Sequence, residues 1–482
     1  MRRILVRIGI AVVVLAIVIA GLIGAFFWTM TSYFNPPPPA FDYPKPKTAL
    51  EAQRQDVDYF EKLVVLDRSY SGGARSDAEE RIGGLKALTA SLEPQRLRVA
   101  LMEIAALADN GHTGVYTAEG MRPKSVPLRV EGFADGLYVM RAKDAALLGG
   151  RVVAIDGVPV DQAMTTLEAL RGGTKAWRRY LAARYVTDQD VLFGTGIAHE
   201  QDVSGWTVQT PMGASVSQRL VSYTPKAGEP IVHPERWLSP EPLKGLSDGW
   251  KTYAPARPLP LSLDDFDHPF RRLRLPGTCA IFIQLKSNVD VGAERIGDFL
   301  RETEAQMRAQ PPCAAIVDLR FDGGGDYTNT YAFANRLPGL VARDGPIFVL
   351  TSPATFSAGI TTVAFIKQAG GARVKIVGEN VGDRLKFYSE GFHGCLPHAP
   401  ACLAYQTGMH DYVEPCRDWR RCYWLNWIYR VRVKTLSPDE PIVMTFRDWS
   451  EGRDPVFERA RDECCGVGRP TVAPLRAAPP SP

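Results

Sequence analysis

Ser357 and a run of three glycines are the residues whose types and spacing point to chemistry. Ser357 lies in Thr355-Phe-Ser-Ala-Gly359, directly after an apolar run, and the glycines lie in Phe321-Asp-Gly-Gly-Gly-Asp326, after another. Hydrolysis of an amide needs a nucleophile, a base and donors aimed at the developing oxyanion. A serine at a strand-to-helix turn exposes its hydroxyl, and residues without Cβ let the backbone approach a scissile carbonyl. We therefore expect Ser357 to be a nucleophile, against the simpler alternative of a turn or helix-capping serine.

The segments around these residues are predicted to form an α/β unit. Apolar runs at 313–320, 346–350 and 374–379 are typical of buried strands, and a helix-like segment spans 360–369. Where strands alternate with helices, the functional site usually lies at the strand ends. The unit is expected to begin near the apolar run at 279–285.

Three motifs follow one another in this unit: Asp318-Leu-Arg-Phe-Asp-Gly-Gly-Gly325, Thr355-Phe-Ser-Ala-Gly359 and Val377-Gly-Glu379. In this order they resemble the core of the tail-specific (C-terminal-processing) serine proteases, most closely the tricorn-core-like branch. The resemblance implies a multidomain α/β protein with a crotonase-like α/β protease core and a peptidase activity. Nothing in the sequence requires a cofactor. It also implies that the oxyanion donors are the amides of Ala358 and of the 323–325 turn, with Gly324 the expected residue.

The same resemblance indicates the base. Asn110-Gly-His-Thr113 is similar to the Asp-Gly-His-Thr that carries the catalytic histidine of the family's histidine-dependent branch, which implies that His112 is the base. Tricorn-type members have a serine just before this histidine, but Gly111 stands here, so another group must orient the imidazole. The lysine position of the classical serine–lysine members is held by Arg384, which does not deprotonate at useful pH. Lys386, two residues later, is the alternative base.

A carboxylate should orient or polarise this base. Tricorn-type enzymes use a glutamate late in the domain, and by that resemblance we expect Glu414, with Asp411 as the second choice. The expected catalytic set is therefore Ser357, His112 and Glu414.

The N-terminus has the composition of a membrane anchor. Arg2, Arg3 and Arg7 precede an uncharged run from Ile8 to Trp28, and about 20 apolar residues suffice to span a bilayer. The arginines should stay cytoplasmic, so we expect residues 1–34 to be an uncleaved signal anchor, with a cleaved signal peptide as the alternative. In both cases the catalytic body lies outside the cytoplasmic membrane, in the periplasm.

Several modules are expected between the anchor and the core. Helical spacing at 50–69 and 96–108 indicates a helical domain. A strand–turn–strand pattern at 130–140 with a helical stretch at 161–170 is similar to a PDZ domain, in which a peptide adds as an extra strand. The alternative is a β-rich packing domain without a ligand groove. The expected domains are the anchor at 1–34, a proline-rich linker at 35–47, a helical domain with the His112 loop at 48–120, a PDZ-like domain at 121–175, a connecting segment at 176–275, the protease core at 276–466 and a disordered tail at 467–482.

Five less regular stretches are also predicted to form strands. The runs at 185–187 and 191–194 are expected to begin a hairpin that 206–214 completes, and 429–433 and 441–446 are expected to be late strands of the core.

The charge composition and the cysteines limit which partners and which cellular compartment the sequence favours. Fifty-seven basic and 53 acidic residues give a net charge of +4, which is too balanced to indicate nucleic acid as a partner. All eight cysteines follow residue 278, and an even number in an extracytoplasmic body favours disulfides. Cys395 with Cys402 and Cys416 with Cys422 are the simplest local pairs. The alternative is a metal site, because His393, His398 and His410 lie among these cysteines, but no regular zinc spacing is present.

Two functions fit the sequence. The first is a membrane-anchored serine peptidase that acts on extracytoplasmic proteins or peptides. The second is a catalytically inactive relative that binds peptides through the PDZ-like module as a scaffold.

Overall fold

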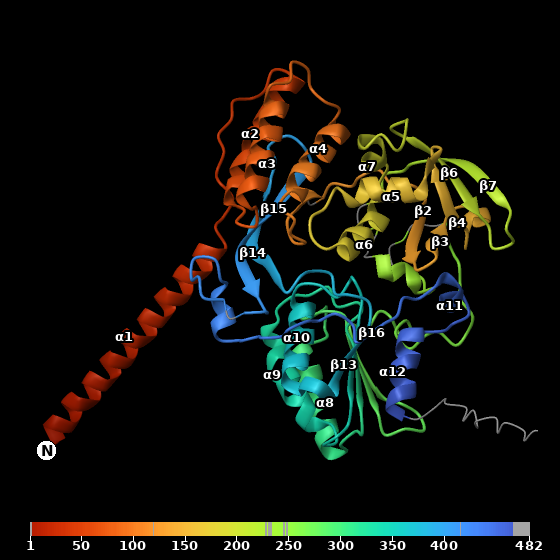
Figure 1. The fold of residues 1–482 in the computed structure, drawn as a ribbon. Coiled ribbons are helices and arrows are strands. Elements are labelled where there is room, and N and C mark those ends of the chain that lie inside the picture. The colour runs from red at the N-terminus through yellow and green to blue at the C-terminus, as the bar shows by residue number, and fades with distance from the viewer. Residues whose placement is uncertain are drawn as a thin grey trace, which may run out of the picture. The chain divides into compact units, whose positions relative to one another are not determined.

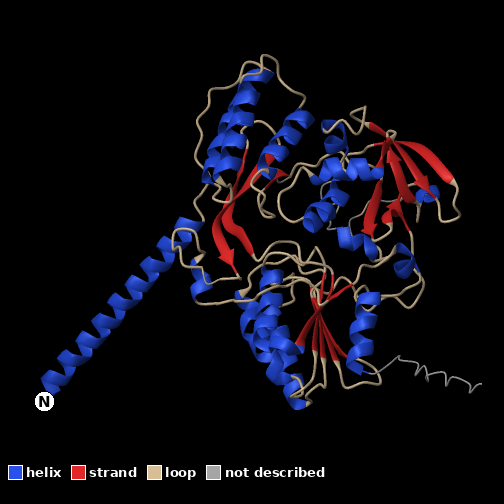
Figure 2. Cartoon of the chain, viewed as in Figure 1, coloured by secondary structure: helices blue, strands red, loops and turns tan. Residues whose placement is uncertain are grey.

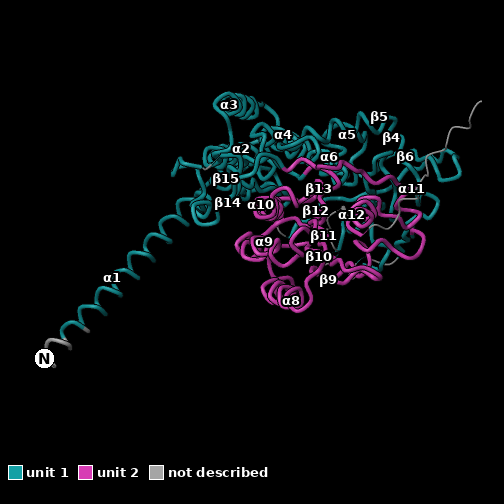
Figure 3. Tube along the Cα trace, turned by 60° about the horizontal axis from the view of Figure 1, so that its bottom comes forward, with its two compact units in different colours: residues 1–254, 381–435 teal, residues 255–380, 436–482 magenta. Residues whose placement is uncertain are grey.

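The computed structural model describes residues 2–118, 120–226, 229, 234–243, 246, 249–414 and 416–465. The chain forms two compact units, which Figure 3 distinguishes by colour: unit 1 contains residues 1–254 and 381–435, and unit 2 contains residues 255–380 and 436–482. Segment 381–435 thus groups with the N-terminal part of the chain, although the sequence boundaries assign it to the core. The domain boundaries themselves stay a prediction.

Unit 2 is built on a six-stranded sheet. Its strands are β9 (Phe270–Arg274), β10 (Ile281–Leu285), β11 (Ala315–Asp318), β12 (Ile347–Thr351), β13 (Val374–Gly378) and β16 (Glu440–Pro441). The order is β16-β13-β12-β11-β10-β9, and all neighbours are parallel except β9, which runs antiparallel to β10. Every residue of β10, β11 and β12 is buried, as expected for parallel strands covered on both faces. The α/β core expected from the apolar runs is confirmed.

Helices cover both faces of this sheet (Figure 2). They are α8 (Ile296–Ala309), α9 (Thr328–Leu340) and α10 (Ala358–Gly370), with α12 (Pro455–Cys465) against β12 and β13 on the other face. Phe282, Ile316 and Phe348 pack with Val456 and Phe457 of α12 in one hydrophobic cluster. The carboxyl ends of the parallel strands therefore lie at the same edge of the sheet. The loops that contain the glycine triplet and Ser357 begin at this edge.

Part of unit 1 combines helices with a small sheet (Figure 1). The helices are α1 (Arg2–Phe34), α2 (Ala49–Leu66), α3 (Gly72–Lys86) and α4 (Pro94–Ala106), and the sheet holds β1 (Gly114–Thr117), β15 (Ala401–Asp411) and β14 (Lys386–Cys395) in that order. Strand β1 pairs antiparallel with β15, so the segment after His112 and a late segment of the chain share one sheet.

The rest of unit 1 is a larger β-rich module. Its seven-stranded sheet contains β2 (Leu128–Phe133), β3 (Gly136–Ala142), β4 (Arg151–Ile155), β5 (Val158–Pro159), β6 (Val203–Gln209), β7 (Ser215–Val221) and β8 (Lys251–Thr252). Helices α5 (Val160–Glu168), α6 (Lys175–Tyr185) and α7 (Gln189–Gly194) accompany it. The strand–turn–strand at 130–140 and the following helix are confirmed, while the PDZ-like identity of this module stays a prediction.

The hairpin expected from the runs at 185–187 and 191–194 is wrong. Tyr185 ends α6, and the second run lies in α7. Both helices start at side-chain caps: Thr174 Oγ1 accepts from the Trp177 amide, and Asp188 Oδ1 accepts from the Val191 amide. These caps override the β-favouring residues that follow. The hairpin is formed by β6 and β7 instead.

The two late strands expected at 429–433 and 441–446 are also wrong. Residues 429–433 form no strand, and of 441–446 only the first residue belongs to β16. Thr445 caps the short helix α11 (Phe446–Ser450) in a reciprocal capping box with Asp448, which stops the apolar run from extending as a strand.

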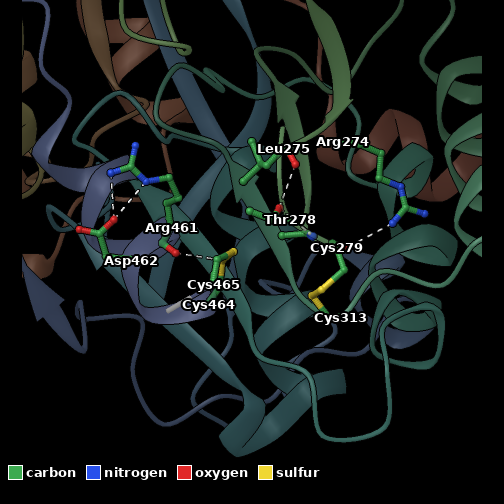
Figure 4. The surroundings of a disulfide bond; sticks show 10 residues. Arg274, Leu275, Thr278, Cys279, Cys313, Arg461, Asp462, Cys464 and Cys465 are labelled. Atoms are coloured by element: carbon green, nitrogen blue, oxygen red, sulfur yellow. Dashed lines mark hydrogen bonds and ion pairs between the residues drawn. A yellow bond between two sulfur atoms is a disulfide. The ribbon is translucent and has the colours of Figure 1, made fainter. Parts of the chain in front are cut away.

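Four disulfides join the eight cysteines: Cys279–Cys313, Cys395–Cys402, Cys416–Cys422 and Cys464–Cys465. The two local pairs expected from the sequence are confirmed. Cys279–Cys313 links the segments that lead into β10 and β11, and Figure 4 shows it together with the adjacent pair at the end of α12. Among the described residues, no group of three or more His, Cys, Asp or Glu side chains is arranged to hold a metal.

Helix α1 is one continuous helix of 33 residues. Its segment Ile10–Phe34 is long and apolar enough to cross a membrane, and none of its most apolar stretch is buried in the protein.

Candidate active site

Ser357 lies at a strained turn between a strand and a helix of unit 2. Strand β12 ends at Thr351 and α10 begins at Ala358, so Ser357 is the last residue before the helix. Its backbone has φ +52° and ψ −122°, a region that L-residues rarely adopt. Ser357 is half-buried, although Thr355, Phe356 and Ala358 around it are buried. Strain of this kind at an accessible serine is typical of a positioned nucleophile.

The glycine turn after β11 packs directly on this serine. Gly324 has φ +108°, and a Cβ at this position would lie 2.7 Å from Ser357 Cβ and 3.0 Å from the Ala358 nitrogen. Any side chain at Gly324 would therefore collide with the candidate nucleophile. The structure thus brings Ser357, Ala358 and Gly324 together, while their catalytic roles stay a prediction.

Asp322 joins the glycine turn to the serine turn. The Gly324 N–H donates to Asp322 Oδ1 at 3.0 Å, and the Phe356 N–H donates to the Asp322 carbonyl at 2.9 Å. Asn288 lies beside the carboxylate, with its amide nitrogen 2.6 Å from Asp322 Oδ1 and 2.7 Å from Oδ2, to which it donates. Burial raises the pKa of Asp322 well above its ordinary value, and the Gly324 hydrogen bond lowers it only in part. Because its N–H is engaged here, Gly324 must exchange this bond before it can serve an oxyanion.

A buried ion cluster lies behind the turn. Arg320 donates from Nε to Asp318 Oδ1 at 3.0 Å and from both terminal nitrogens to Asp454 at 2.8 Å. Burial alone would lower the pKa of Arg320, but the two carboxylates raise it overall. Burial alone would raise the pKa of Asp454, but Arg320 lowers it below its ordinary value. Removing one member would leave a buried charge without its partner, so the cluster fixes the loop base.

His112 lies in unit 1, in the turn between α4 and β1. Its Nδ1 is 3.6 Å from Asp383 Oδ2, and the two side chains are only 13% and 1% exposed. The imidazole also stacks on Phe387, with ring centroids 5.4 Å apart and planes inclined by 9°. Asp383 and Phe387 therefore supply the orientation that Gly111, in place of a serine, does not.

Side chains hold this turn against the β14–β15 hairpin. Asn110 makes two hydrogen bonds to Tyr388 of β14, accepting from its N–H and donating to its carbonyl, each at 3.0 Å. Gln406 of β15 donates to the His112 carbonyl at 3.1 Å. A side chain that pairs with both backbone groups of a strand residue acts like a short neighbouring strand, and it fixes the position of His112.

The other residues considered from the sequence are Lys386, Glu414 and Arg384, and their side chains are more exposed than that of His112. Lys386 is 60% exposed and forms an ion pair with Asp411 at 3.3 Å. Glu414 is exposed in the turn after β15, where its N–H donates to Asp411 Oδ1. Arg384, at the family's lysine position, pairs with Asp109 at 2.8 Å.

Sequence reasoning did not identify Asp383 or Asp322. Asp322 lies inside the glycine motif, so its type and position were visible. Asp383 directly precedes Arg384, but nothing in the sequence around it indicates that it lies beside His112. Because His112 and Ser357 belong to different units, their predicted meeting in one cleft stays a prediction.

No protein-family model and no curated protein matches the sequence. Among solved structures, the CPAF S499A mutant is similar with a TM-score of 0.59 and 12% identity, over 87% of this chain and 98% of that chain. Mature CPAF complexed with lactacystin gives a TM-score of 0.55 and 13% identity, over 86% and 97%. The photosystem II D1 C-terminal processing protease gives only 0.37 at 12% identity, over 83% and 99%, which is too low to carry an argument. The similarity to CPAF confirms the mixed α/β, multidomain fold that the tail-specific protease motifs predicted.

Proposed function

We propose that this chain is a serine peptidase of the tail-specific protease family, acting on proteins or peptides. The observation that supports this best is the strained backbone of Ser357, against which Gly324 packs so closely that no side chain would fit. A serine that only caps a helix needs neither feature, because an ordinary cap has extended backbone angles and no close neighbour. Since a fold does not imply a function, the proposal rests on this local geometry.

In the proposed reaction, His112 accepts the proton of Ser357 Oγ as the oxygen attacks the scissile carbonyl carbon. The amides of Ala358 and Gly324 stabilise the oxyanion, and collapse of the tetrahedral intermediate expels the amine, which takes the proton from His112. Water then hydrolyses the acyl-enzyme by the same sequence of proton transfers. We assign the orienting carboxylate to Asp383 in place of Glu414, because Asp383 Oδ2 lies 3.6 Å from His112 Nδ1.

We further propose that α1 anchors the enzyme in the cytoplasmic membrane with its catalytic body on the periplasmic side. The apolar length of α1 and the four disulfides support this assignment. The sheet that contains β2 and β3 is the proposed peptide-binding module, by its resemblance to a PDZ domain.

A fluorophosphonate probe tests the nucleophile without a known substrate. Full-length protein in detergent should be labelled at Ser357, and Ser357→Ala should abolish the labelling. His112→Ala should reduce the labelling rate nearly as much, because members of one catalytic unit are not additive. Lys386→Ala should keep most of the labelling rate.

Two outcomes would contradict the proposal. Absence of labelling in the unaltered protein would favour the inactive peptide-binding scaffold. Loss of labelling in Lys386→Ala with retention in His112→Ala would assign the protein to the serine–lysine mechanism.

A further inference from the structure

The segment 416–434 of unit 1 combines basic and aromatic residues, and we call it the basic aromatic segment. It contains a single acidic residue, Asp418. Its basic residues, all exposed, are Arg417, Arg420, Arg421, Arg430, Arg432 and Lys434. Its aromatic residues are Trp419, Tyr423, Trp424, Trp427 and Tyr429. None of these residues takes part in the proposed chemistry.

This segment packs against the C-terminal part of α1 (Figure 1). The Trp424 ring lies 5.0 Å from that of Phe27 and 6.2 Å from that of Phe26. Further along the helix, Tyr33 donates to the Arg420 carbonyl at 3.1 Å, and its ring lies 6.4 Å from that of Trp419. The Tyr33–Arg420 hydrogen bond joins residues 387 positions apart, so these contacts arise from the tertiary structure and not from neighbouring sequence.

The position of these contacts along α1 sets their depth in a bilayer. A helix rises about 1.5 Å per residue, and about 20 residues cross the hydrocarbon layer. Counted from Ile8, the first residue after the basic N-terminus, the hydrocarbon layer ends near Phe27 and Trp28. Trp424 therefore lies at the boundary between hydrocarbon and headgroups, and Trp419, beside Tyr33, lies in the headgroup layer.

Two apolar side chains of the segment remain exposed. Trp419 is 57% exposed and Ile428 is 55% exposed, although the neighbouring Trp424 is buried. Tryptophan is favoured at the membrane–water interface, and arginine binds phosphate groups through several donors. An exposed apolar pair among six cations matches the chemistry of an anionic phospholipid surface.

We propose that the basic aromatic segment is a second membrane contact, in which Trp419 and Ile428 enter the interfacial layer and the arginines bind phosphates of anionic phospholipids. It acts in the leaflet where α1 leaves the membrane. The proposal rests on the proposed anchoring by α1 and is independent of the peptidase activity. The positive-inside rule does not oppose it, because that rule concerns residues close in sequence to the spanning helix.

Photo-crosslinking of the full-length protein in lipid nanodiscs tests the contact. Benzoylphenylalanine replaces one residue at a time, at Trp419 or Ile428, in discs of phosphatidylcholine with phosphatidylglycerol. Trp28, 74% exposed on α1, is the positive control, and Met212, 94% exposed in the turn between β6 and β7, is the negative control. We expect phospholipid adducts, identified by mass spectrometry, at Trp28, Trp419 and Ile428, and none at Met212.

The controls separate the two proposals. Adducts at Trp28 without any at Trp419 and Ile428 would overturn the second contact and leave the anchor intact. No adduct at Trp28 would overturn the anchor, and with it the contact that depends on it.

A charge variant tests the lipid class. The triple variant R417Q/R420Q/R421Q, carrying the probe at Ile428, should lower the adduct yield at least about fivefold in discs with phosphatidylglycerol, and much less in pure phosphatidylcholine. The matched control R295Q/R301Q/R308Q removes three exposed arginines of unit 2 and should leave the yield unchanged. An equal yield for the first triple variant and the unaltered protein in anionic discs would overturn the role of the arginines. Mass spectrometry of the intact disulfides confirms folding of each variant.

Discussion

Two buried carboxylates, Asp383 and Asp322, hold the residues on which the proposed chemistry depends. Asp383 lies beside the ring of His112, and Asp322 connects the glycine turn to the turn that carries Ser357. Neither is expected to contact substrate, so both act by positioning. Because both side chains are buried, a single substitution at either should strongly change the position of the neighbouring catalytic groups. Removing one member of a buried polar contact leaves its partner without compensation.

The first prediction concerns the carboxylate at His112. Asp383→Asn keeps the shape of the side chain but removes its charge and adds a donor toward Nδ1, which favours the wrong tautomer. We expect the rate of fluorophosphonate labelling at Ser357 to fall roughly 10²–10⁴-fold. Glu414→Gln is the matched control and should retain most of the rate, because Glu414 is exposed. The reverse pattern would return the role to Glu414.

The second prediction concerns the pH dependence of stability at Glu379. Burial raises the pKa of this half-buried carboxyl to about 7, partly offset by the charge of Arg320. A raised pKa means that the folded state favours the protonated form, so this stability is present below about pH 4.5 and is lost as the pH rises toward 7. Glu379→Gln mimics the protonated form and should be more stable than the unaltered protein at pH 8, by at most about 3 kcal/mol, with little difference at pH 4.5.

Urea unfolding of both proteins at pH 4.5 and pH 8 measures this difference. Glu302→Gln, whose side chain is 66% exposed on α8, serves as the control and should show a much smaller change. An equal stability difference at both pH values would show that Glu379 is not protonated preferentially in the fold.

At the scale of elements, the candidate site depends on which segments lie next to the motif turns. Strand β14 supports the His112 turn through the contact of Asn110 with Tyr388, although 278 positions separate these two residues in the chain. In unit 2, the parallel order of β11 and β12 places the glycine turn and the serine turn at one edge of the sheet. The positions of the catalytic groups are thus set by strand pairing rather than by local sequence.

The third prediction tests the Asn110 contact. Asn110→Ala removes both hydrogen bonds to Tyr388 and should lower the labelling rate at least about tenfold, because a shift of the base of about 1 Å is costly. Asn110→Asp keeps the acceptor but loses the donor, so it should fall between Asn110→Ala and the unaltered protein. Asn335→Ala, on α9, is the control and should label normally. A labelling rate unchanged in Asn110→Ala would show that the turn needs no support from β14.

At the scale of the whole molecule, the proposed chemistry needs both compact units. Unit 2 carries the nucleophile and oxyanion donors, and unit 1 carries the proposed base and its carboxylate. Unit 1 also carries α1, so the anchor and the base belong to the same part of the protein.

The fourth prediction concerns topology. An alkaline phosphatase reporter fused after Pro482 should be active, because it requires an oxidising, extracytoplasmic compartment, and a fluorescent reporter that matures only in the cytoplasm should be dark. Replacing Arg2, Arg3 and Arg7 by glutamine should reduce the correctly oriented fraction, since these residues hold the N-terminus inside. A cytoplasmic signal from the C-terminal fusion would contradict the proposed orientation.

The sequence alone determined the elements whose signals are local. The three apolar runs, the glycine triplet, the serine turn and the N-terminal helix are each encoded by neighbouring residues, and all were found where expected. Local pairs of cysteines, such as Cys395 with Cys402, were predictable because short loops close easily. Local propensity misled at 191–194 and 441–446, where helix caps outweighed β-favouring side chains.

Only the tertiary structure decided the contacts made between distant segments. Asp383 was one carboxylate among many until β14 brought it to His112, and the fit of Gly324 against Ser357 depends on the register of two strands. The placement of the basic aromatic segment beside α1 likewise follows from contacts across most of the chain. Such contacts depend on the packing of whole elements, and no periodicity within one segment records which distant segment will meet it.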